Sequence, residues 1–79
     1  MSQLDKLVAR LRARPVTASI GDVRKVLDAY GWELRSQKGS HLSFRKPGDA
    51  RLLTICTENG KTVKTVYLDK VCDYLGLDD

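Results

Sequence analysis

The stretch Trp32–Lys46, WELRSQKGSHLSFRK, predicts a β-hairpin around which the rest of the chain is organised. Apolar Trp32 and Leu34 alternate with polar residues before a glycine-containing turn. Leu42 and Phe44 alternate with polar residues after it. Because side chains alternate between the two faces of a strand, one face of the hairpin is expected to be buried and the other to carry polar groups.

The turn and the polar face hold the candidate functional residues. Lys38-Gly39-Ser40 forms the turn, and Gly39 allows a backbone conformation that other residues avoid. His41, Ser43 and Arg45 share the face opposite the apolar pair of the second strand. His41, the only histidine of the chain, is therefore expected to point away from the core.

A first helix is predicted at the N-terminus. Ser2 and Asp5 are spaced as a capping box, and Pro15 stops the helix after about Arg14. Apolar residues recur on one side of it at helical spacing: Leu4, Leu7, Val8 and Leu11. We interpret this basic amphipathic helix, residues 1–15, as docking its leucine stripe on the domain, and a basic arm that touches RNA or a partner is the alternative.

A second helix precedes the hairpin. Residues 15–18 are interpreted as a short linker, and Ser19 and Asp22 are spaced as a second capping box. Gly31 fits the left-handed position that ends such a helix.

A further strand and helix follow the hairpin. Arg51–Thr57 reads as a strand with Leu53 and Ile55 inward, and residues 58–61 read as a polar loop. The last helix is indicated by apolar residues at helical spacing, namely Leu68, Val71, Cys72 and Leu75. The predicted class is α+β, with the order α-β-β-β-α: a three-stranded antiparallel sheet backed by two helices, plus the extra N-terminal helix. Residues 19–79 are expected to form this domain, and its order of helices and strands matches that of double-stranded-RNA-binding domains. The whole chain is expected to be a single globular unit.

Charge is concentrated around the hairpin. The net charge is +4, but residues 35–64 contain seven cations and two acids, which is +5 for this segment alone. The cations are Arg35, Lys38, Arg45, Lys46, Arg51, Lys61 and Lys64. A basic surface of this kind suits a nucleic acid or an acidic protein, and a solvated face is the alternative.

The histidine beside these cations suggests chemistry on a phosphodiester. An imidazole can take a proton from a ribose 2′-hydroxyl or give one to a leaving 5′-oxygen. Lys and Arg can stabilise charge that builds up on the phosphate. An ordinary exposed strand histidine, and a turn serine that bonds nearby backbone, are the simpler readings of His41 and Ser40.

Other classes of site have little support in the sequence. Cys56 and Cys72 with one histidine do not form a zinc motif, and we expect two reduced cysteines, no metal and no other cofactor. The Lys-Gly-Ser order is not that of a phosphate-binding P-loop. No apolar run is long enough to cross a bilayer and no secretory signal is evident, so we expect a cytoplasmic protein without membrane contact.

These patterns together resemble the HicA toxin family of type II toxin–antitoxin systems. The resemblance rests on Tyr30-Gly31-Trp32, on Lys38-Gly39-Ser40-His41 with Phe44, on Thr54-Ile55, and on Val66-Tyr67-Leu68, and it covers about Ile20 to Leu77. Two positions depart from the family pattern. Leu42 stands where many members have a second histidine, and Cys56 stands where a proline is frequent.

The resemblance implies mRNA cleavage and neutralisation by a HicB-like antitoxin. It also places the catalytic histidine of the family on His41, flanked by Gly39 and Ser40. Residues expected from their position to contact RNA are Arg35, Lys38, Gly39, Ser40, Arg45 and Lys64. A non-catalytic RNA-binding module and a protein-interaction domain remain as alternatives, and the sequence leaves open whether His41 acts as base or acid.

Overall fold

A computed structural model describes residues 2–77. Met1, in the predicted helical segment 1–15, and Asp78 and Asp79, in the predicted domain 19–79, lie outside the described residues. Within the described range the order of elements is α1 (Gln3–Arg12), β1 (Thr17–Ser19), α2 (Ile20–Ala29), β2 (Glu33–Lys38), β3 (His41–Arg45), β4 (Leu52–Glu58), β5 (Thr62–Lys64) and α3 (Thr65–Leu75).

The fold is α+β, as predicted, but its antiparallel sheet is larger than three strands. Five strands are arranged in the order β1-β5-β4-β3-β2, and the predicted hairpin and third strand form β2, β3 and β4. The predictions of a linker over residues 15–18 and of a loop leading directly to the last helix were therefore incomplete. β1 and β5 have three residues each, which is too few to show the alternation of a strand in the sequence. They pair with one another although most of the chain separates them in the sequence.

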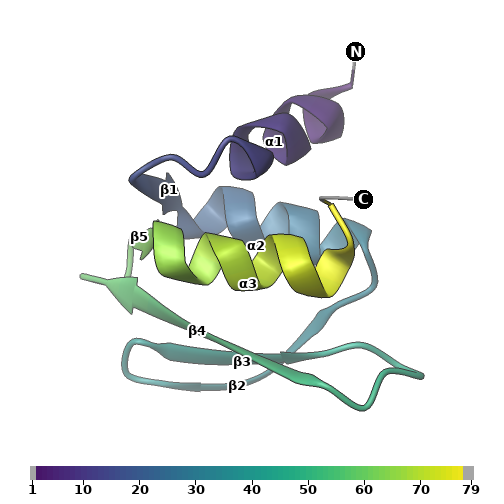
Figure 1. Cartoon of the computed structure of the whole chain (residues 1–79). Coiled ribbons are helices and arrows are strands. Elements are labelled where there is room, and N and C mark those ends of the chain that lie inside the picture. The colour runs from purple at the N-terminus through teal and green to yellow at the C-terminus, as the bar shows by residue number, and fades with distance from the viewer. Residues whose placement is uncertain (1, 78–79) are drawn as a thin grey trace.

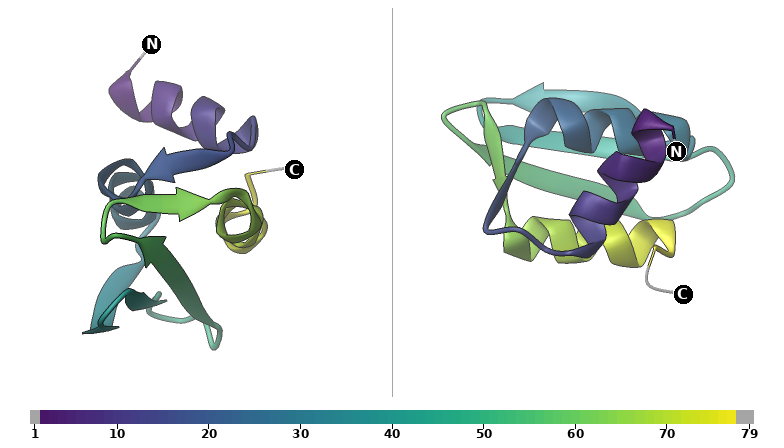
Figure 2. Two further views of the ribbon diagram at one scale, coloured as in Figure 1. Left: turned by 90° about the vertical axis from the view of Figure 1, so that its left-hand side faces the viewer. Right: turned by 90° about the horizontal axis from the view of Figure 1, so that it is seen from above.

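All three helices lie on one side of the sheet. α2 and α3 run side by side above β2, β3 and β4 (Figure 1), and α1 crosses over both helices when the molecule is seen from above (Figure 2, right). The other face of β2, β3 and β4 carries no helix, and we call it the open face. The predicted polar side of the hairpin belongs to this face.

Local signals set the ends of α2, with one correction. The Ser19 side chain accepts a hydrogen bond from the Gly21 backbone (3.2 Å), and so it caps the helix. Asp22 does not complete the predicted capping box, because it lies 3.4 Å from the guanidinium of Arg10 on α1. At the other end Gly31 has a φ of +88°, and Trp32 donates to the Leu27 carbonyl (2.9 Å), which ends the helix.

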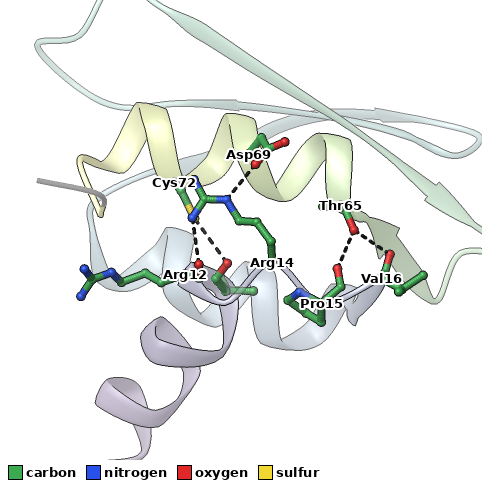
Figure 3. A network of polar contacts seen from close by, with 8 residues as sticks. Arg12, Arg14, Pro15, Val16, Thr65, Asp69 and Cys72 are labelled. Atoms are coloured by element: carbon green, nitrogen blue, oxygen red, sulfur yellow. Dashed lines mark hydrogen bonds and ion pairs between the residues drawn. The ribbon is translucent and has the colours of Figure 1, made fainter.

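α1 is tied to the two helices beneath it. Ser2 and Asp5 form the predicted capping box, and Leu7 and Leu11 are buried. Beyond the helix, Arg14 pairs with Asp69 on α3 at 2.7 Å (Figure 3). These contacts support the docked arrangement of the N-terminal helix.

The linker after α1 is also held by α3. The Thr65 hydroxyl donates to the carbonyls of Pro15 (2.6 Å) and Val16 (3.1 Å), and the thiol of Cys72 donates to the Leu11 carbonyl (3.5 Å) (Figure 3). The start of α3 therefore has a fixed position relative to β1 and β5. Over residues 2–77 no helix is long and apolar enough to cross a membrane.

Candidate active site

His41 is the first residue of β3 and is exposed. It follows the two-residue turn Gly39-Ser40, and it pairs with Lys38, the last residue of β2. Gly39 has a φ of +58°, which suits the first position of a tight hairpin turn. The Ser40 carbonyl accepts the Thr57 backbone N–H at 2.9 Å, so the hairpin tip is held against β4.

The alternation predicted for β3 is confirmed. Leu42 and Phe44 are buried and pair with Ile55 and Leu53 of β4, which are buried as well. His41 therefore belongs to the open face.

A row of side chains crosses the open face at His41. The register pairs Lys38 with His41 and His41 with Cys56 on β4. The pairing of β5 with β4 ends at Thr57↔Val63, so Lys64 and Cys56 are the next residues of the two strands beyond the last pair. We call Lys38, His41, Cys56 and Lys64 the His41 row. Strands are about 4.8 Å apart, so the row is roughly 14 Å long from the first strand to the last.

Two predicted RNA contacts are not brought to His41. Arg45 ends β3 and pairs with Glu33, four residues along the strand from His41, which corresponds to roughly 13 Å. Arg35 lies in the irregular part of β2 between Leu34 and Ser36, and its guanidinium is 3.6 Å from the Glu33 carboxylate. Both arginines are on the far part of the hairpin, so they can contact a long ligand but not the atoms next to the imidazole.

The two lysines of the row differ in their surroundings. The amino group of Lys64 is 2.7 Å from the Glu58 carboxylate, and this hydrogen bond raises the pKa of Lys64. Lys38 forms no ion pair with any residue in the described range 2–77. Lys38 is therefore free to meet an anion, whereas Lys64 must exchange Glu58 for one.

Tyr67 is a residue of this region that sequence reasoning did not assign to the site. It flanks the apolar stripe of α3, so its spacing indicates packing. In the structure the Cys56 side chain acts on its hydroxyl through hydrogen bonding and charge, and this raises the pKa of Tyr67. Cys56 is the residue of β4 that pairs with His41, so the tertiary structure connects Tyr67 with this region, and the local sequence of α3 does not indicate it.

The arrangement is suited to proton transfer beside a phosphate. An exposed imidazole can reach a proton on a bound ligand, and the lysines on both sides of it favour a negative group there. No cluster of three or more His, Cys, Asp or Glu side chains that could hold a metal ion occurs among residues 2–77.

Comparison with known families gives a match that covers most of the chain. The family model for the HicA toxin of bacterial toxin–antitoxin systems matches residues 20–77. The chain belongs to the HicA toxin family. It is therefore the toxin of a toxin–antitoxin pair, and it has an antitoxin partner. No curated protein and no solved structure matches the chain.

The HicA match includes the whole open face. It begins at Ile20, the first residue of α2, and contains β2, β3, β4, β5 and α3. α1 and β1 lie outside it. The His41 row thus belongs entirely to the HicA part of the chain, whereas the helix that covers α2 and α3 does not.

Proposed function

We propose that this HicA toxin is an endoribonuclease that cleaves mRNA with His41 as its catalytic residue. The observation that supports the proposal most directly is the place of His41 in its row. It is exposed on the open face, beside Lys38 on one strand and with Lys64 beyond Cys56 on the other side. A phosphodiester laid over this row would meet an imidazole between two cations.

The reaction is an internal transfer on the RNA strand. The ribose 2′-oxygen bonds to phosphorus, and the bond from phosphorus to the 5′-oxygen of the next nucleotide breaks. The products are a 2′,3′-cyclic phosphate and a 5′-hydroxyl end. His41 either takes the proton of the 2′-hydroxyl or gives a proton to the leaving 5′-oxygen.

The neighbouring groups would bind the substrate and stabilise the transition state. Lys38 and Lys64 would offset negative charge on the phosphate oxygens. Gly39 and Ser40 would contact the strand at the hairpin tip, where the surface is open: a Cβ added to Gly39 would meet no atom within 4 Å. Arg35 and Arg45 would hold the strand farther along the open face. With these groups the reaction needs no metal and no other cofactor.

The proposal is tested by incubating the purified toxin, free of antitoxin, with a defined RNA in EDTA beside His41→Ala. The wild type is expected to cleave the RNA, and the cleavage rate of the variant should be about 10²–10⁴-fold lower. Because the side chain is exposed, the circular dichroism spectrum of His41→Ala should remain that of the wild type. The phosphate should be found at the 3′ end of the upstream fragment, and the downstream fragment should carry a 5′-hydroxyl.

Other results would indicate other functions. RNA that is bound but stays intact with both proteins would support the RNA-binding module in place of the enzyme. Absence of RNA binding, with a tight complex with the antitoxin, would support a protein-interaction domain. Equal cleavage by both proteins would contradict the role of His41.

We also propose that the antitoxin is HicB-like. Because its effect is to neutralise the toxin, adding the purified antitoxin to the cleavage reaction should stop it. An antitoxin that binds the toxin while RNA cleavage continues would contradict this neutralisation.

A further inference from the structure

The flank of α3 that borders β4 carries two tyrosines, two helical turns apart. Tyr67 is close enough to Cys56, near the end of β4, for that side chain to raise its pKa, and Tyr74 contacts Arg51, which precedes the start of β4, at 4.6 Å from guanidinium carbon to ring centre. α3 and β4 therefore run in opposite directions beside each other, as Figure 1 shows. β5 pairs with only Thr57 and Glu58 of β4, so the strand before them is open to α3.

The first turns of α3 combine this tyrosine with two lysines. Lys64, the N-cap residue, and Lys70 lie three positions before and after Tyr67, so all three fall on neighbouring turns. The amino group of Lys70 is 5.9 Å from the centre of the Tyr67 ring. The ring is half-buried and Lys64 and Lys70 are exposed. The surface thus offers one hydroxyl between two cations, next to the residue that pairs with His41.

We propose that Lys64, Tyr67 and Lys70 form a second phosphate-binding site, which holds the RNA strand on the β4 side of His41. This inference rests on the proposed function. It assigns a path to the substrate: the strand crosses the sheet along the His41 row, from Lys38 at the hairpin tip to the start of α3. A strand that is held at His41, Arg35 and Arg45 without any contact at the start of α3 is the alternative.

The chemistry of the three groups fits a phosphodiester better than a base. A half-buried ring does not present a face on which a base can stack. A hydroxyl donor with a cation on each side matches anionic oxygens, and hydrogen bonds to charged groups are stronger than neutral ones.

Binding requires one exchange of partner. The Tyr67 hydroxyl directs its proton to a phosphate oxygen, and the neighbouring Cys56 thiol can donate to the tyrosine oxygen. Lys64 leaves Glu58, 2.7 Å away, for the phosphate. Removing the negative charge of Glu58 should therefore improve RNA binding.

The test measures RNA affinity in the His41→Ala background, so that the RNA stays intact. Tyr67→Phe keeps the ring and removes the hydroxyl, and Tyr74→Phe makes the same change at the other end of the helix. We expect Tyr67→Phe to weaken binding about tenfold or more, the size of a hydrogen bond to a charged group, and Tyr74→Phe to leave it unchanged. Glu58→Gln should tighten binding, and Lys70→Ala should lower the salt slope by about 1.

Thiol labelling gives a readout that does not depend on affinity. Cys56 is half-buried and Cys72 is fully buried, so an alkylating reagent should modify Cys56 first. Bound RNA should protect Cys56 if the strand follows the proposed path. An RNA that binds without protecting Cys56, and with equal affinity for Tyr67→Phe, would overturn this site while leaving cleavage by His41 intact. A protein that binds no RNA would overturn both proposals.

Discussion

At the scale of single residues, the proposed reaction divides the cations of the open face into those near the reacting phosphate and those that would hold the rest of the RNA strand. Lys38 is the direct partner of His41 across the hairpin, whereas Arg45 lies four residues along β3. Both are exposed cations on the open face, and the sequence alone does not distinguish them. Of these two cations, Lys38 is the one that can stabilise charge at the scissile group of the proposed reaction, because this effect requires close approach.

We therefore predict different kinetic effects for Lys38→Ala and Arg45→Ala. Lys38→Ala should lower kcat about tenfold or more, because it removes a charge that acts on the transition state. Arg45→Ala should mainly raise KM, with an effect that fades as salt is added. Single-turnover cleavage at low and high salt measures both, and equal losses of kcat in the two variants would contradict the assignment.

At the scale of elements, Arg51 joins the turn between β3 and β4 to the C-terminal end of α3. Arg51 pairs with Asp49 at 2.8 Å and donates to the Tyr74 carbonyl at 3.0 Å, so it links the connection between β3 and β4 to the end of α3. Its guanidinium also lies over the Tyr74 ring. This cluster is remote from the His41 row, so its contribution is to stability.

The Asp49 carboxylate makes this contribution depend on pH. The hydrogen bond from the Arg51 side chain lowers the pKa of Asp49 from 3.8 to about 2. A lowered pKa in the folded state means that the stabilisation is present above about pH 4 and is lost as the pH falls toward 2. Melting temperatures of the wild type and Asp49→Asn should therefore differ at neutral pH and converge near pH 2. A difference that stays constant over this range would contradict the role of the ion pair.

The helix that lies outside the HicA match, α1, is packed as part of the core. Leu11 of α1 is fully buried, and its carbonyl accepts a hydrogen bond from Cys72 of α3. We propose that residues 1–15 and the domain from residue 19 onward fold as one unit. β1 supports this proposal, because the segment after α1 adds a strand to the sheet.

Leu11→Ala tests this integration. Deletion of a fully buried leucine side chain typically costs about 2–5 kcal/mol, so we expect a loss of this size in the free energy of unfolding. Urea unfolding should show a single transition, and Lys6→Ala, at an exposed position on the same helix, should change little. A small effect of Leu11→Ala, or an early separate transition, would show that the helix is a detachable arm.

At the scale of the whole molecule, local patterns in the sequence determined the helices, the hairpin and the face on which His41 lies. Capping residues, glycines at the ends of helices and strand alternation act over a few residues, and for this reason they could be read directly. The burial of Leu42 and Phe44 and the exposure of His41 follow from that alternation alone.

The tertiary structure decided what surrounds the histidine. The pairing of β3 with β4 puts Cys56 opposite His41, and the pairing of β4 with β5 brings Lys64 and the start of α3 to the same place. The same pairing leaves Arg35 and Arg45 at the far end of the hairpin. Strand register is set by hydrogen bonds and packing between distant segments, and three-residue strands such as β1 and β5 carry too little pattern to specify it. The sequence therefore determined which residue carries the proposed chemistry, and the fold decided which neighbours it has.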